Sequence, residues 1–175
     1  MADERPQGIV LRRDRDLEGR VWQIWVRRGL MLIPLAIVGA ALLNLFGQVP
    51  VTSTSASTAA TLGVRAPDHL RGGLLFEGRF EIHAREDIAD ARLELEDGWL
   101  EGMSINTIEP SPASETSHDG RLQLDLGHIA AGDTYRLYMQ FQVLATNVGR
   151  RSADVTLWDG RTQILSLDRT ITVVP

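Results

Sequence analysis

The side chains that could do chemistry in this chain of 175 residues are its histidines and acids, and their spacing matches no site pattern. His69, His83, His118 and His128 are scattered and lack the H-x-x-x-H spacing of a metal site. The sequence contains no cysteine, which excludes disulfide bonds and thiolate ligands. We therefore expect the histidines to be surface or turn residues.

The acidic residues from Glu86 to Asp97 alternate with other residues, which is typical of the solvated face of a strand. A calcium site in the loops between Asp87 and Asp97 is the alternative, although the D-x-[DN]-x-[DN]-G spacing is missing. No serine lies in a G-x-S-x-G motif, and no glycine-rich phosphate loop precedes a helix. The formal net charge is −5, without a basic face for nucleic acid. The sequence thus predicts no enzyme, no cofactor, no nucleic-acid partner and no identifiable small-molecule substrate.

An apolar run from Gly29 to Phe46 is the strongest feature of the chain. A helix of this length spans about 27 to 30 Å, the hydrocarbon thickness of a bilayer. Arginines lie just before the run, and the first charge after it is Arg65. By the positive-inside rule, we expect a bacterial plasma-membrane protein with its N-terminus inside and its C-terminal domain outside. A cleaved signal peptide is the alternative.

The residues before this span predict a cytoplasmic tail (1–16) followed by an amphipathic juxtamembrane helix (17–28). Apolar side chains recur there at helical spacing, and Gly29 and Pro34 offer a place for the chain to turn into the membrane. A docking surface for a partner is the alternative to a purely interfacial helix. The residues expected at the lipid headgroups are Trp22, Trp25, Arg20, Arg27 and Arg28.

One face of the predicted transmembrane helix (29–47) carries small residues and an amide. Small residues let a second helix approach, and an amide in hydrocarbon prefers a partner. The alternative is that these residues are ordinary for such a helix and that the amide reaches the outer interface. The expected helix-packing face consists of Ala36, Gly39, Ala40, Asn44 and Gly47.

Residues 48–61 are rich in serine, threonine and alanine, and residues 51–61 carry no charge. Such a composition predicts a flexible linker with a reach of about 20 Å.

Residues 62–175 change to a period of two, with stretches such as GRFEIHA and YRLYMQFQV bounded by Asp-Gly turns. This pattern predicts an all-β, immunoglobulin-like sandwich of about seven to nine strands outside the membrane. The least regular stretch, from Met103 to Ser117, is expected to be a long crossing loop. Trp99 and Trp158 flank glycine turns and are candidate contact residues of this domain, with burial in the core as the alternative.

The stretch from Asp119 to Val143 resembles the bacterial DUF11/CARDB-type domains of cell-surface proteins. Leu126-Gly127-His128-Ile129 and Gly132-Asp133 match their strand–turn–strand pattern, and APDHLRGG resembles their opening strand. This resemblance implies an immunoglobulin-like fold for residues 62–175 and is nearly silent on function. The whole chain also resembles small single-pass proteins of actinobacteria, which implies a multi-pass partner of the YetF type.

Three functions remain open from the sequence. The leading hypothesis is a non-enzymatic accessory or interaction subunit that contacts membrane lipids and either another integral membrane protein or further copies of itself. The second is a surface module that binds cell-wall glycan or peptide through Trp99 or Trp158. The third is a transmembrane regulator that holds a cytoplasmic partner by its N-terminal segment.

Overall fold

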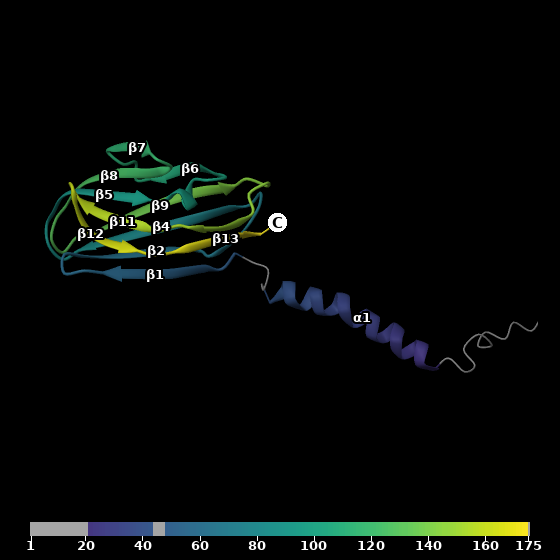
Figure 1. Ribbon diagram of the computed structural model, residues 1–175. Helices are drawn as coiled ribbons and strands as arrows, with labels where there is room; N and C mark the ends of the chain where they lie inside the picture. Colours follow the sequence, from purple (N-terminus) through teal and green to yellow (C-terminus); the bar gives the residue numbers. More distant parts are fainter. Residues whose placement is uncertain (1–20, 44–47, 175) are drawn as a thin grey trace, which may run out of the picture. The chain divides into compact units, whose positions relative to one another are not determined.

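The computed structural model describes residues 21–43 and 48–174. The chain divides into an N-terminal unit, which ends at Gly47, and a C-terminal unit, which begins at Gln48 (Figure 1). Each unit is considered by itself below.

The N-terminal unit contains one helix, α1 (Val21–Leu42), which runs through both Gly29 and Pro34 without a break. The predicted change of element at Gly29 is therefore wrong for the described residues. The reason is that glycine is tolerated within a helix at modest cost, while Pro34 removes only the hydrogen bond to Leu30. Residues 17–20 and 44–47 of the two predicted helices lie outside the described residues.

The stretch of α1 from Trp22 to Leu42 is long and apolar enough to cross a membrane. An N-terminal apolar helix of this kind is consistent with a signal anchor or a signal sequence, and its orientation stays a prediction.

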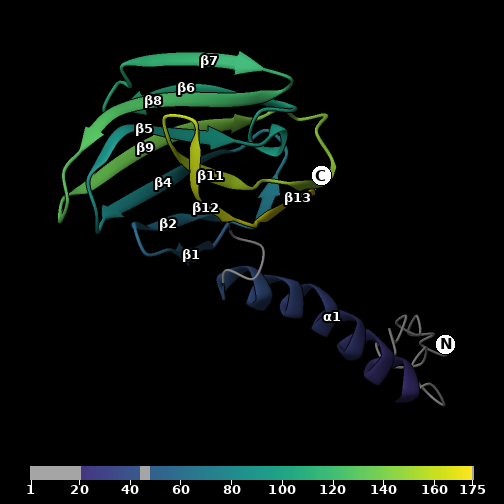
Figure 2. The ribbon, with the colours of Figure 1, turned by 60° about the vertical axis from the view of Figure 1, so that its left-hand side comes forward.

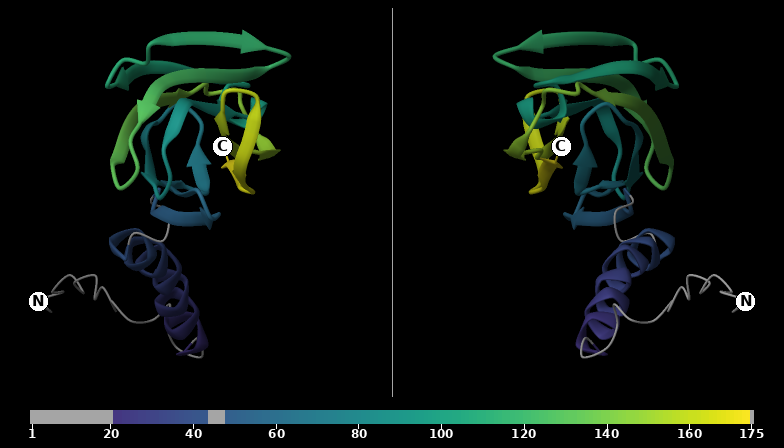
Figure 3. Two further views of the ribbon diagram at one scale, coloured as in Figure 1. Left: turned by 90° about the vertical axis from the view of Figure 1, so that its left-hand side faces the viewer. Right: turned by 90° about the vertical axis from the view of Figure 1, so that its right-hand side faces the viewer.

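The C-terminal unit is a β-sandwich of three hydrogen-bonded sheets, which can be followed in Figures 1, 2 and 3. The first sheet has the order β1-β2-β4-β9-β6 and consists of β1 (Pro50–Ala56), β2 (Ala60–Pro67), β4 (Leu75–Ala84), β9 (Thr134–Val143) and β6 (Met103–Glu109). The second has the order β12-β11-β5-β8-β7 and consists of β12 (Thr162–Leu167), β11 (Val155–Asp159), β5 (Ile88–Leu95), β8 (Arg121–Ile129) and β7 (Ser114–His118). A small third sheet has the order β10-β13-β3 and consists of β10 (Gly149–Ser152), β13 (Thr170–Val174) and β3 (His69–Arg71).

The described residues form thirteen strands, more than the seven to nine predicted. The difference arises partly because the predicted linker is not a linker: its residues form β1 and the start of β2, paired antiparallel from Pro50↔Pro67 to Ala56↔Thr61. An edge strand needs backbone hydrogen bonds and only one partly covered face, so small polar residues and β-branched threonines suffice. Ser55, for example, faces inward and donates to the carbonyl of Ser166 at 2.9 Å.

The predicted crossing loop from Met103 to Ser117 is likewise wrong, because it contains the edge strands β6 and β7. Both have largely exposed side chains. A bulge between Ile105 and Thr107 also interrupts the alternation of β6, which hides the strand period in the sequence. A mostly β sandwich is therefore observed, whereas the finer assignment to an immunoglobulin-like type stays a prediction.

Alternating inward side chains of the facing sheets form one apolar core, as the period of two predicts. A short 3-10 helix, η2 (Asp97–Trp99), delivers the largest of these side chains, and Trp99 is 0% exposed. The Trp99 ring lies 5.3 Å from both Phe80 and Phe141, centroid to centroid, and its Nε1 donates to the carbonyl of Ala153 at 2.8 Å. Trp99 therefore cannot be a contact residue of the folded domain.

The approach of η2 to β10 explains the glycine that precedes this tryptophan. A Cβ atom on Gly98 would lie 1.9 Å from the carbonyl oxygen of Ser152, far inside contact distance. Only glycine allows the backbone to come this close and place Trp99 in the core.

Candidate functional site

The histidines lie apart from one another on the sandwich surface. The imidazole of His83 contacts the Thr134 hydroxyl at 3.0 Å, and that of His128 contacts Asp87 at 2.8 Å. His118 contacts Asp119 at 3.1 Å, in a turn where both side chains are more than four-fifths exposed. Within the described residues, no group of three histidines or acids could hold a metal ion. These contacts are local pairs on the surface of the sandwich.

Trp158 lies on β11 and is half-buried, so part of its ring is open to a partner. Its Nε1 is buried and has no acceptor among the residues that the structure describes. Of the two predicted contact tryptophans, Trp158 alone remains a candidate.

The predicted headgroup residues that are described lie near the start of α1. Trp22 and Trp25 are 63% and 67% exposed, and the Arg28 guanidinium lies 5.5 Å from the centre of the Trp25 ring. Arg27 follows on the same helix. Arg20 lies outside the described residues. Their contact with lipid stays a prediction.

Three of the five residues of the predicted helix-packing face are described, namely Ala36, Gly39 and Ala40. The i, i+3 and i+4 spacing places them on one side of α1. Nothing lies within 4 Å of a Cβ added at Gly39, as is also the case at Gly29. Asn44 and Gly47 lie outside the described residues.

Arg169 is a buried charge that the sequence did not single out. It follows β12 at the corner into β13, and its side chain is 2% exposed. Its guanidinium donates to the carboxylate of Asp68 and to the carbonyl oxygens of Ala66 and Val64. It also reaches the edge strand β1, where it donates to the hydroxyl of Ser53 at 3.3 Å. Burial lowers the pKa of Arg169, while the negative charge of Asp68 opposes that shift. Arg169 thus links β1 and β2 to the C-terminal strands.

An open polar hollow of about 450 Å³ adjoins this corner. Its lining consists of Asp68, His69, Arg150, Asp168 and Arg169, interspersed with serine and threonine. Asp68 and Arg169 form an ion pair in its wall, and the buried Nε of Arg169 has no partner among the described residues. The hollow therefore lies on the outer side of a structural link.

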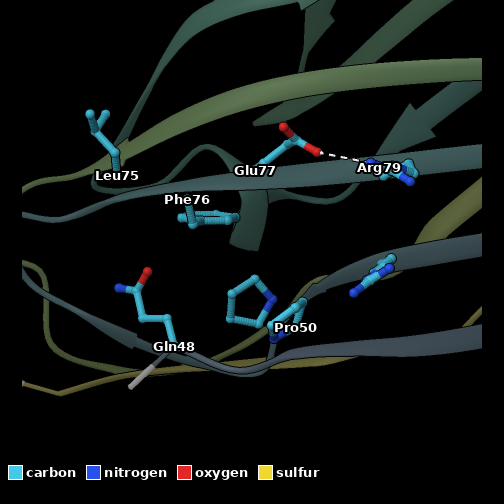
Figure 4. A pocket seen from close by; sticks show the side chains of 8 residues that line it. Gln48, Pro50, Leu75, Phe76, Glu77 and Arg79 are labelled. Atoms are coloured by element: carbon cyan, nitrogen blue, oxygen red, sulfur yellow. Dashed lines mark ion pairs between the residues drawn. The ribbon is translucent and has the colours of Figure 1, made fainter. Parts of the chain in front are cut away.

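A second hollow, of about 330 Å³, lies beside β1, β2 and β4 (Figure 4). Glu77 and Arg79 form an ion pair at 3.6 Å on its rim, and the Arg79 guanidinium lies 4.8 Å from the centre of the Tyr138 ring. Phe76 in its wall belongs to the core. The arrangement contains no acid–base pair beside a nucleophile and offers at most a shallow contact surface.

Comparison with known proteins finds no family model that matches the chain and no curated protein that matches it. Solved structures do show likeness. A non-cellulosomal cohesin from the hyperthermophilic archaeon Archaeoglobus fulgidus is 11% identical, with a TM-score of 0.39, over 73% of this chain and 92% of that chain. The PmoD soluble domain from a Methylocystis species is 12% identical, with a TM-score of 0.31, over 70% of this chain and 97% of that chain. The chain thus contains a β-sandwich domain that distantly resembles these two, and the likeness extends to the fold alone.

Proposed function

We propose that the chain is a non-enzymatic, single-pass membrane protein that acts as an accessory or interaction subunit. It docks through α1 and its immunoglobulin-like sandwich onto an integral membrane protein, for which the resemblance noted above favours a multi-pass protein of the YetF type. Association with further copies of the chain itself is the other form of the same function.

The observation that carries this proposal is that the Trp22–Leu42 stretch of α1 is long and apolar enough to cross a membrane. In a bilayer such a helix meets either lipid or another helix, and the small residues at Ala36, Gly39 and Ala40 favour close approach of a helix. The alternative of a glycan-binding module is weaker, since of its two tryptophans Trp99 is buried in the core.

Enlarging the small face is expected to weaken the association. In the Ala40→Leu variant the added side chain keeps the neighbouring helix away, and we expect roughly tenfold weaker binding, as for a loss of about 1.4 kcal/mol. The measurement is the amount of partner that co-purifies with the intact chain from its native membrane in mild detergent.

The matched control is Ala41→Leu, which makes the same change one residue further, about 100° around the helix. Co-purification should survive this control. A specific packing face on α1 would be contradicted if the two variants lost the co-purified partner equally, or if neither variant lost it.

A further inference from the structure

Exposed apolar side chains gather at one end of the sandwich. Leu74, Leu75, Leu144 and Val148 are each about half exposed, between 47% and 53%. We call these four residues the apolar end patch. They lie in the β3–β4 connection, at the start of β4 and in the β9–β10 connection. The connections at the opposite end of the same strands carry Arg85, Glu86 and Asp133 instead.

Backbone hydrogen bonds join the segments of the patch into one surface. The amide of Gly73 donates to the carbonyl of Val143 at 2.9 Å, and the amide of Val143 donates to the carbonyl of Leu74 at 3.0 Å. Leu74 and Leu144 therefore extend from directly bonded segments.

The β3–β4 and β9–β10 connections each have a fixed backbone conformation, so the exposure of their apolar side chains is a property of the folded domain. Gly73 has a φ of +83°, and a Cβ on Gly72 would lie 2.9 Å from the carbonyl oxygen of Ala145. In the other connection, Asn147 is buried and its amide donates to the carbonyls of Glu101 and Gly102 at 3.2 and 3.1 Å. A surface shaped in advance loses little conformational entropy when it binds.

The chain enters the sandwich beside this patch. With its amide oriented to satisfy both neighbours, Gln48 donates to the carbonyl of Leu75 at 3.3 Å and accepts from the amide of Arg71 at 3.1 Å. Four residues separate Gln48 from Leu43, the last described residue that follows α1. At no more than 3.6 Å per residue, Leu43 and Gln48 lie within about 18 Å of each other. This short connection therefore keeps the patch close to any surface at which α1 ends.

The charges beside the patch suit a phosphate-rich surface. Arg71 precedes the exposed leucines, Arg150 follows Val148, and both side chains are exposed. The nearby Glu101 is already paired with Arg151 at 3.0 Å. Arginine binds phosphate oxygens strongly, and apolar residues flanked by basic ones are typical of segments that insert at a lipid interface.

We propose that the apolar end patch inserts into the headgroup region of the bilayer that α1 crosses, so that lipid is the direct partner of this end of the sandwich. The proposal rests on the membrane anchor of the proposed function and adds a second, independent membrane contact. It places the opposite end of the sandwich, with Arg85 and Asp133, away from the lipid.

Because the chain has no cysteine, single labels can test this in the full-length protein. Ala145→Cys and Ala131→Cys place a fluorophore at two exposed alanines that follow and precede β9, at its opposite ends. Each variant is reconstituted into vesicles of equal phosphatidylcholine and phosphatidylglycerol, with or without brominated chains that quench fluorescence on contact. Insertion to a depth of about 5 to 10 Å predicts at least about twofold stronger quenching at position 145 than at 131.

Two further variants make the result decisive. Leu74→Ser with Leu144→Ser, both at half-exposed positions, should leave the melting temperature unchanged and lower quenching at 145 to the value at 131. Ile33→Cys labels the middle of α1 and reports the anchor alone. Two outcomes would overturn the lipid contact and leave the anchor intact. In the first, the label at position 33 is quenched while the labels at positions 145 and 131 are quenched equally. In the second, the label at position 145 is quenched as strongly with the two serine substitutions as without them. An unquenched label at 33 would contradict the anchor and the lipid contact together.

Discussion

Replacing Trp99 with alanine is expected to lower the free energy of unfolding by about 3–5 kcal/mol. The substitution empties a fully buried site against Phe76, Phe80 and Phe141, and it leaves the carbonyl of Ala153 without its indole donor. Urea unfolding of the intact chain in mild detergent, followed by far-ultraviolet circular dichroism, measures the loss.

The half-buried Trp158 provides the matched control, since Trp158→Ala removes the same side chain from β11. We expect it to cost clearly less than Trp99→Ala, because part of its ring is already in water and its Nε1 has no acceptor to lose among the described residues. Equal losses at the two positions would contradict Trp99 as the centre of the core.

Replacing Arg169 with methionine is expected to cost about 2–4 kcal/mol, because it removes a buried guanidinium that several polar groups share as a hydrogen-bond donor. The carbonyl oxygens of Val64 and Ala66 and the carboxylate of Asp68 all accept from this one guanidinium. Arg169→Lys should recover only part of the loss, since a single ammonium cannot reproduce the planar fork. The same unfolding experiment measures both variants.

Arg136→Met is the control for removing an arginine of an ion pair. Arg136 pairs with Glu81 at 3.2 Å, but both side chains are about half exposed, so the change should fall within about 1 kcal/mol. If Arg169→Met were as mild as Arg136→Met, Arg169 would not be the link between β1, β2 and the C-terminal strands.

The strands that the sequence predicted well are those with one buried face. In YRLYMQFQV, the side chains of Leu137, Met139, Phe141 and Val143 all reach the core, as their alternation indicated. The edge strands β1 and β7 escaped prediction because exposed, mostly polar residues carry no such period, and β6 escaped it because a bulge interrupts its alternation. Their pairing depends on backbone hydrogen bonds to β2, β9 and β8, which any residue except proline can make.

The buried Arg169 and the apolar end patch were harder to predict than the strands of the core, for a different reason. Arg169 has partners more than one hundred positions away, so nothing near it in the sequence marks it as buried. Leu74 and Leu144 come together only once β4 and β9 pair. One local signal of the apolar end patch did exist. Two leucines follow Gly72-Gly73 in succession, and the second of them breaks the alternation of apolar residues that continues through Phe76 and Phe80. The sequence did not decide whether Trp99 is a contact residue or a core residue, because tryptophans of both kinds occur beside glycine turns.

The most direct test of the central claim is the composition of the particle that contains the intact chain. Purified from its native membrane in mild detergent, the chain should migrate in a complex of fixed stoichiometry, with a second integral membrane protein or with further copies of itself. The fraction of the chain found in that complex, measured by light scattering and by native mass spectrometry, should decrease in the Ala40→Leu variant, as roughly tenfold weaker binding requires, but not in Ala41→Leu. A monomer alone, recovered with α1 intact, would contradict the account.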